Sequence, residues 1–298
     1  MVAAAPAGMR IWLMAARPRT LPAAIAPVIV GTALAVDRDV FHPLAFLAAL
    51  LGSILIQVGT NLANDYSDAR RGADTDDRLG PVRVTAGGLA PPRQVLMATY
   101  ATFGLAVLCG VYLVTVAGPE LLLVGVASIL AGVTYTGGPK PYGYEGLGEV
   151  FVFLFFGVVA VVGSYYVQIQ RLPWEAFVLS VPVGLLAAAI LVVNNVRDLE
   201  TDRRAGKRTL AVRLGRERTR VLYAGMVAAA FLTALVPWVA GSLSVWLLLT
   251  WLALPLGIPV VQTVRERTDG PSLNGALART GMLQLAFCLL LAAGTVLS

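Results

Sequence analysis

Long apolar stretches without a charged residue are the strongest constraint on how this chain folds. They run over residues 20–36, 40–64, 94–119, 121–139, 150–170, 176–196, 221–264 and 280–298. A transmembrane helix needs about 20 apolar residues, so most stretches are one span long. The stretch 221–264 holds two spans, divided near Pro237 to Ser242. The sequence therefore predicts an all-α integral membrane protein with nine transmembrane helices, in which residues 1–298 form a single domain.

The distribution of Lys and Arg predicts the orientation of these helices. With a cytoplasmic N-terminus, 21 of the 23 basic residues lie on the cytoplasmic side, and only Arg38 and Arg171 lie outside. Hydrophobic residues make up 57% of the chain and charged residues 13%, which excludes an ordinary soluble domain. The net charge of +6 then describes the cytoplasmic face, which would attract anionic headgroups or substrates. Nucleic acid is not needed to explain it, and we expect none as a partner.

Two clusters of Asn and Asp residues end two of the apolar segments on the cytoplasmic side. They are Asn61, Asn64, Asp65 and Asp68 in the first cluster and Asn194, Asn195, Asp198 and Asp202 in the second. A spacing of four residues places Asn64 and Asp68 on one helix face, and likewise Asn194, Asp198 and Asp202. An acidic residue at the centre of a membrane helix costs roughly 2.5 to 3.5 kcal/mol and less near its end, so these clusters require a compensating partner.

The oxygen ligands in both clusters suit a hard divalent cation. Mg²⁺ is usually held by one or two carboxylates together with substrate phosphates, so two opposed clusters could clamp a diphosphate through bridging Mg²⁺. Basic residues are interleaved with the acids, and they could bind phosphate oxygens directly. They are Arg70, Arg71, Arg197, Arg203, Arg204, Lys207 and Arg208. The alternative for any one of them is a solvated salt bridge at a helix end. The repetition of the clusters four spans apart suggests two related four-helix halves followed by a ninth helix.

The two clusters resemble the aspartate-rich motifs of the UbiA superfamily of intramembrane prenyltransferases, and the resemblance covers nearly the whole chain. Other segments are similar to the 1,4-dihydroxy-2-naphthoate prenyltransferases of menaquinone biosynthesis. They are Trp12 with residues 17–22, and residues 68–74, 135–141, 144–157 and 206–210. One departure is Gly72, which stands where the superfamily commonly has a third acid in the first motif. Asp74 is shifted from that position, and its role as a ligand stays open.

The resemblance implies a UbiA-type fold of nine helices around a central cavity, in the inner membrane of a bacterium. It also implies that Mg²⁺ and the Asp clusters hold a polyprenyl diphosphate while it ionises to an allylic cation. The dihydroxynaphthoate ring then attacks the cation, and prenylation replaces the ring carboxylate. The products are CO₂, diphosphate and demethylmenaquinone, which this redox-neutral step leaves in its hydroquinone form. Prenyl chain length and oligomeric state are not predicted.

Three sets of candidate site residues follow from the clusters and the resemblance. The catalytic set is Asp68, Asp198, Asp202 and Lys140. The metal ligands are Asn64, Asp65, Asp68, Asp198 and Asp202. The substrate-binding set is Arg17, Asn64, Asn194, Tyr135, Lys140, Tyr144, Arg197 and Lys207.

Some of these residues have an equally simple structural interpretation. Lys140 follows a tight turn that could direct its ammonium group at a substrate, yet it also obeys the expected topology. Arg17 could bind an anion or anchor the first helix at the membrane surface. Tyr135, Tyr142 and Tyr144 could line an aromatic site or belong to an interfacial belt. Glu145 and Glu149 could orient the naphthoate hydroxyls or act as bases, and carboxylates at helix starts are also ordinary. His42, on the outer side, is given no catalytic role.

Two other functions compete with naphthoate prenylation. One is a UbiA-type enzyme with another acceptor, such as 4-hydroxybenzoate, haem or a sugar phosphate, and the segment from Tyr135 to Glu149 would decide between acceptors. The other is a secondary transporter, since repeats and polar clusters also mark that class. The acids here lie at helix ends on one side and no span interior carries a charge, which favours an enzyme. The apolar spans exclude a soluble polyprenyl synthase.

Overall fold

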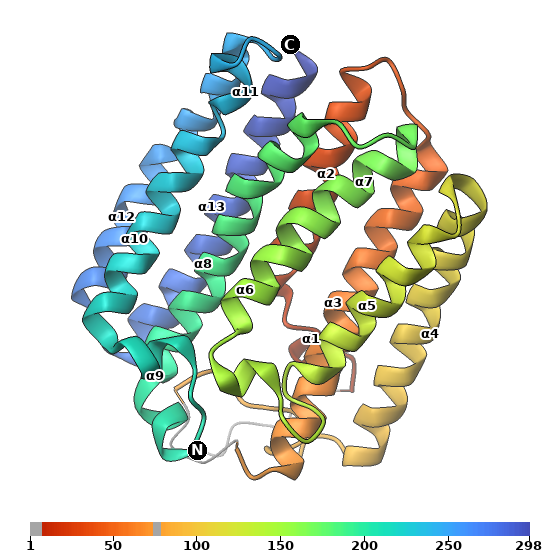
Figure 1. Cartoon of the computed structure of the whole chain (residues 1–298). Coiled ribbons are helices and arrows are strands. Elements are labelled where there is room, and N and C mark those ends of the chain that lie inside the picture. The colour runs from red at the N-terminus through yellow and green to blue at the C-terminus, as the bar shows by residue number, and fades with distance from the viewer. Residues whose placement is uncertain (1–7, 74–78) are drawn as a thin grey trace.

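The structure, a computed structural model, describes residues 8–73 and 79–298, and all regular structure in these ranges is helical (Figure 1). The α-helices are α1 (Gly8–Ala16), α2 (Pro22–Val36), α3 (Pro43–Arg70), α4 (Pro92–Ala117), α5 (Glu120–Thr134), α6 (Gly148–Val152), α7 (Ala160–Ile169), α8 (Trp174–Arg204), α9 (Leu210–Leu214), α10 (Arg216–Thr233), α11 (Val236–Val239), α12 (Leu254–Glu266) and α13 (Gly270–Val296). Tighter or wider turns form η1 (Pro18–Thr20), η2 (Tyr142–Glu145), η3 (Phe153–Val159) and η4 (Val245–Ala253). The prediction of an all-helical protein is therefore confirmed for the described residues.

Seven helical segments of the described chain are long and apolar enough to cross a membrane. They are Pro43–Arg70, Pro92–Ala117, Gly148–Ile169, Trp174–Arg204, Arg216–Val239, Val245–Glu266 and Gly270–Val296. The pair Gly8–Thr20 and Pro22–Val36, bent by 53°, is an eighth candidate. Helix α5 has only 15 residues, or about 22 Å, which is shorter than a hydrocarbon core of about 30 Å. Seven or eight candidate spans are thus present, and the predicted count of nine is not confirmed.

Helix α8 forms the interior of the bundle. In its most apolar 18-residue stretch, 72% of the residues are buried inside the protein, against 17% in the corresponding stretch of the peripheral helix α4. Helices α10 and α13 and the turn η3 pack against it, and α2 packs against α7 and α13 (Figure 1). Helices α4 and α5 instead expose large apolar side chains such as Leu108 and Leu123. A surface of that kind requires a lipid environment, which agrees with a multi-pass membrane protein.

Small residues allow the helices around α8 to approach closely. A Cβ atom on Gly157 of η3 would lie 2.6 Å from the Cα atom of Gly184 on α8. A Cβ atom on Gly31 of α2 would collide with the backbone of Val161 on α7. Contacts of this kind are typical of membrane helix bundles, where small residues permit close backbone packing. They fix η3, whose π-helical turn carries the aromatic residues Phe155 and Phe156 of the cavity wall.

The two ends of the bundle carry different polar groups. The acids of the first cluster lie at the end of α3, about 39 Å from His42 at its beginning. Around His42, the side chain of Gln168 accepts a hydrogen bond from the His42 backbone N–H at 2.6 Å. Arg38 pairs with Glu175 at 3.4 Å at this same end. The candidate acids therefore gather at one end, as the sequence predicted, and His42 lies at the other.

Candidate active site

A cavity of about 460 Å³ runs between the helices, and the charged side chains of its lining gather at one end. Its apolar walls come from α4, α5, α7 and η3, with side chains such as Val111, Leu122 and Phe155. Its polar end is formed where α3 and α8 finish, together with the loops that follow them. The cavity therefore joins a long apolar channel to a cluster of charged side chains, which suits an amphipathic ligand with an anionic head.

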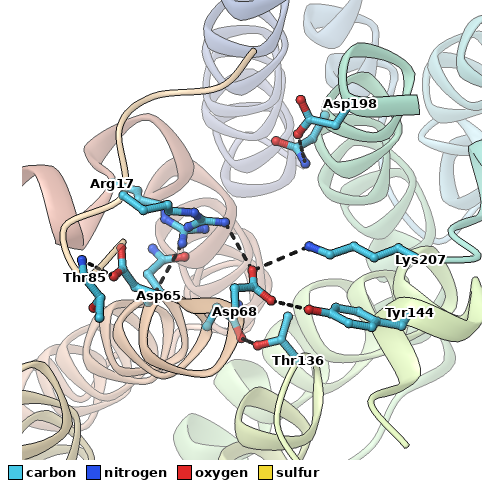
Figure 2. Close-up of polar contacts among 12 residues, drawn as sticks. Arg17, Asp65, Asp68, Thr85, Thr136, Tyr144, Asp198 and Lys207 are labelled. Carbon is cyan, nitrogen blue, oxygen red and sulfur yellow. Dashed lines mark hydrogen bonds and ion pairs between the residues drawn. The ribbon is translucent and has the colours of Figure 1, made fainter. Parts of the chain in front are cut away.

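Asp68 is the centre of the polar end. Its Oδ1 atom accepts a hydrogen bond from the Tyr144 hydroxyl at 2.6 Å. Its Oδ2 atom lies 3.6 Å from an Arg83 nitrogen and 3.7 Å from Lys207 Nζ (Figure 2). The side chain of Asp68 is almost fully buried, and a buried carboxylate requires such cationic and hydrogen-bonding partners. Residues from α3 and from three separate loops thus converge on one carboxylate.

Backbone contacts hold two of these loops together. The Arg208 N–H donates to the Tyr144 carbonyl at 2.8 Å, and the Gly143 N–H donates to the Tyr135 carbonyl at 3.0 Å. Lys207 Nζ lies 4.7 Å from the centre of the Tyr144 ring, a cation–π contact. The positions of Lys207 and Tyr144 beside Asp68 are therefore fixed by the loop backbones as well as by their own side chains.

Asp198 faces the same cavity from α8 and is held by its neighbour Arg197. The Nε and Nη2 atoms of Arg197 donate to the two oxygens of Asp198 at 2.7 and 2.6 Å. Arg197 also donates to Asn194 Oδ1 at 2.8 Å and to Asn274 Oδ1 at 2.7 Å. Asn274, on α13, in turn donates to the Leu79 carbonyl at 2.9 Å. These contacts connect α8, α13 and the loop from 79 to 91.

Asp65 is buried away from the cavity. Its two oxygens accept hydrogen bonds from the backbone N–H groups of Val84 at 3.0 Å and Thr85 at 2.8 Å. Arg83, which contacts Asp68, is the residue immediately before this pair. Figure 2 shows Asp65 beside Thr85. Asp65 therefore anchors the loop that carries Arg83, which contacts Asp68 at the polar end.

The structure brings most of the predicted site residues to the wall of the cavity. Those that line it are Arg17, Asn64, Asp68, Tyr135, Tyr144, Asn194, Asp198, Asp202 and Lys207. Three predicted residues are not part of this wall: Asp65, the exposed Lys140 and the buried Arg197. Asp74 lies outside the described residues. The individual roles of all these residues stay predictions.

Several cavity residues were not identified from the sequence. Arg83 contacts Asp68, and the Thr136 hydroxyl donates to Asn64 Oδ1 at 2.9 Å. The buried Thr209 hydroxyl lines the cavity and has no hydrogen-bond partner among the described residues. Arg83 stands in an irregular loop where no helical period points to it, whereas Thr136 lies within the segment 135–141 already selected for its resemblance.

Aromatic rings form the wall next to the polar end. Tyr142 stacks on Phe151 with ring centroids 3.9 Å apart and meets Tyr135 edge-on at 5.4 Å. The Tyr142 hydroxyl donates to the Ala131 carbonyl at 2.8 Å. Burial raises the pKa of Tyr142 and that of Tyr135, for which the nearby Glu149 acts in the same direction. Both phenols therefore stay protonated at neutral pH and present neutral, electron-rich rings to the cavity.

The donor set fits a cation shared with a ligand better than one enclosed by protein. The described residues contain no group of three or more His, Cys, Asp or Glu side chains that could hold a metal ion. Asp68 on α3 and Asp198 and Asp202 on α8 instead line one cavity from two helices. Mg²⁺ commonly uses one or two carboxylates and completes its coordination with phosphate oxygens and water.

This bundle of apolar helices, with acids and bases at one end of a deep apolar cavity, defines a multi-pass membrane protein suited to lipid-like anionic substrates. The UbiA prenyltransferase family matches residues 24–278. The 1,4-dihydroxy-2-naphthoate octaprenyltransferase of Mycobacterium tuberculosis is 44% identical over 94% of this chain and 95% of the relative. The Escherichia coli protein of that name is 40% identical over 96% of this chain and 95% of the relative. The chain belongs to the UbiA prenyltransferase family and is a membrane prenyltransferase.

Solved structures give the same fold. A UbiA homologue from Archaeoglobus fulgidus, described as bound to GPP and Mg²⁺, superposes with a TM-score of 0.68. It covers 97% of this chain and 100% of its own, with 16% sequence identity. A UbiA homologue from Aeropyrum pernix gives a TM-score of 0.67 over 92% of this chain and 97% of its own. The UbiA-type fold predicted from the sequence is therefore confirmed.

Proposed function

We propose that this protein transfers a polyprenyl group from polyprenyl diphosphate to 1,4-dihydroxy-2-naphthoate in menaquinone biosynthesis. The main support for this proposal is that Asp68 and Asp198 lie on two helices around one cavity, which has apolar and aromatic walls. The names of relatives 40% to 44% identical over nearly the whole chain support naphthoate as the acceptor.

The donor diphosphate would lie at the polar end, between α3 and α8. Arg83 and Lys207, which contact Asp68, and Arg17, which lines the same end, supply the cations for its phosphate oxygens. The prenyl tail would follow the apolar walls of α4 and α5. We retain Lys140, whose side chain is exposed, only as a contact for a substrate entering from the cytoplasm.

We assign Mg²⁺ to Asn64, Asp68, Asp198 and Asp202, the predicted metal ligands that line the cavity. Bound Mg²⁺ offsets the negative charge that develops on the departing diphosphate. For Asp65 and Arg197 we propose positioning roles, because Asp65 holds the loop that carries Arg83 and Arg197 fixes both oxygens of Asp198.

The reaction breaks the C–O bond between the prenyl group and diphosphate and forms a C–C bond to the acceptor ring. The ring carbon attacked carries the carboxylate, which leaves as CO₂ and returns its bonding electrons to the ring. The rings of Tyr135, Tyr142 and Phe151 line the cavity next to one another, where they would stabilise the allylic cation. The apolar wall excludes water, which would otherwise capture that cation.

We further propose that α5 is a short ninth span, packed against α3 and α4. With the N-terminus in the cytoplasm, the polar end of the cavity then faces the cytoplasm, where the loops carry most of the basic residues. The protein would lie in the inner membrane of a bacterium.

An acceptor panel tests this function. Purified protein in detergent is incubated with Mg²⁺, a polyprenyl diphosphate and either 1,4-dihydroxy-2-naphthoate or 4-hydroxybenzoate, and the products are analysed by mass spectrometry. We expect a prenylated, decarboxylated naphthalene product. Turnover of 4-hydroxybenzoate without turnover of the naphthoate would overturn the proposal.

A further inference from the structure

Only one of the two oxygens of the buried Glu149 carboxylate has a hydrogen-bond partner among the described residues. Its Oε1 atom accepts a hydrogen bond from Asn195 Nδ2 at 2.7 Å. Its Oε2 atom is buried and has no hydrogen-bond partner among the described residues. Both side chains are only 5% exposed. Burying a carboxylate with an unused oxygen is costly, so the Glu149–Asn195 pair requires an explanation beyond helix packing.

The hydrogen bond fixes which way the Asn195 amide points. A carboxylate oxygen accepts hydrogen bonds, so the NH₂ group of Asn195 must face Glu149 and its carbonyl oxygen must face elsewhere. Asn195 lines the cavity, whereas Glu149 does not. None of the described residues donates a hydrogen bond to Asn195 Oδ1. The pair therefore presents a carbonyl acceptor to the cavity.

Asn195 lies at the depth where the acceptor ring must sit. It precedes Asp198 by three residues on α8, which places it about 4.5 Å deeper along the helix axis than the proposed diphosphate site. The Tyr135 ring packs near the preceding turn of α8, since a Cβ atom on Gly148 would contact both the Tyr135 ring at 3.3 Å and Leu191 of α8 at 3.0 Å. The reacting carbon of the prenyl group is attached to the diphosphate. The acceptor ring must therefore lie next to the diphosphate, on the side toward the cavity interior.

We propose that Glu149 is a positioning residue which orients Asn195 to accept a hydrogen bond from a ring hydroxyl of the acceptor. This inference rests on the proposed function and adds a basis for selecting the reduced substrate. A hydroxyl donates to the Asn195 carbonyl, whereas the carbonyl of the corresponding quinone cannot. Accepting that hydrogen bond also increases electron density on the ring that attacks the allylic cation.

The test compares the kinetics of wild-type protein with those of Glu149→Ala. Freeing the amide should raise the KM for 1,4-dihydroxy-2-naphthoate about 10-fold, the effect of losing one oriented hydrogen bond. The KM for polyprenyl diphosphate should not change. Inhibition by 2-carboxy-1,4-naphthoquinone should strengthen relative to substrate binding, because the freed amide can turn its NH₂ group to a quinone carbonyl. Glu149→Gln, which keeps an acceptor oxygen, should restore most of the wild-type preference.

Two further variants keep the result interpretable. Glu145→Ala is the matched control, because Glu145 ends the preceding turn η2, is exposed, pairs with Arg213 and does not line the cavity. Its kinetics should match those of wild type. If Glu149→Ala does not fold, the double variant Glu149→Leu and Asn195→Leu replaces both buried polar groups with apolar ones of similar size. It should show the same rise in the acceptor KM.

The inference is overturned if Glu149→Ala leaves the acceptor KM and the quinone preference unchanged, if the double variant leaves the acceptor KM unchanged, or if both substrate KM values rise together. Absence of naphthoate turnover by the wild-type protein would instead refute the proposed function itself.

Discussion

Replacing Asp65 with Asn separates its two candidate roles, as a metal ligand and as the anchor of the loop from 79 to 91. Both oxygens of Asp65 accept backbone N–H groups, at 3.0 Å from Val84 and 2.8 Å from Thr85. An amide keeps one acceptor and turns its NH₂ group toward the other N–H, which leaves that buried donor unpaired. Such a donor costs about 1 to 3 kcal/mol, so Asp65→Asn should lower the free energy of unfolding by roughly that amount.

The assay measures thermal unfolding in detergent together with the Mg²⁺ concentration that gives half-maximal prenyl transfer. Asp68→Asn, at a residue that lines the cavity, is the comparison. We expect Asp65→Asn to melt at a lower temperature while its Mg²⁺ requirement stays within about threefold of wild type. For Asp68→Asn the requirement should rise by about 10-fold or more. An Asp65→Asn protein with wild-type stability and a strongly raised Mg²⁺ requirement would refute the anchor role and restore Asp65 as a ligand.

Three further predictions follow from the contacts around the cavity. Tyr144→Phe removes the hydrogen bond to Asp68 but keeps the ring beside Lys207. Steady-state kinetics should show a KM for polyprenyl diphosphate about 10-fold higher, and an unchanged KM would contradict a role for Tyr144 in orienting Asp68. Gly184→Val places a side chain against Phe153 and η3, and overpacking should lower thermal stability by about 1 to 3 kcal/mol; a variant as stable as wild type would show that η3 can move away. Asn274→Leu removes the hydrogen bonds that connect Arg197 to Leu79. Limited proteolysis should therefore cut the loop from 79 to 91 faster. An unchanged cleavage rate would mean that Asp65 alone holds this loop.

Helical periodicity predicted the cavity-facing members of both motifs. Asn64 and Asp68 are four residues apart, as are Asn194 and Asp198, and all of them line the cavity. Rotation about the helix axis accounts for Asp65 and Arg197, although Asn195, which has the same offset from Asn194, still lines the cavity. Asp65 follows Asn64 directly and is rotated by about 100° from the shared face, and Arg197 is offset in the same way from Asp198. These two residues were predicted as site residues from their residue type alone. In the structure, Asp65 contacts the loop from 79 to 91 and Arg197 contacts α13.

The rest of the site depends on contacts that are remote in sequence. Arg83 reaches Asp68 because the intervening loop folds back onto Asp65, and no local pattern encodes that return. The pairing of Glu149 with Asn195 likewise joins residues 46 positions apart. The bundle itself was predictable because apolar stretches report membrane spans directly. The length of α5 was not predictable in this way, because the charge-free stretch 121–139 continues beyond the end of the helix at Thr134 into the turn around Tyr135.

The fate of the substrate carboxylate tests decarboxylating prenyl transfer directly. Wild-type protein is supplied with Mg²⁺, a polyprenyl diphosphate and 1,4-dihydroxy-2-naphthoate labelled with ¹³C in its carboxylate, and labelled CO₂ and prenylated product are quantified by mass spectrometry. We expect equal amounts of the two from wild-type protein and loss of both in folded Asp68→Asn and Asp198→Asn variants. A prenylated product that retains the label, or undiminished turnover in both variants, would contradict this mechanism.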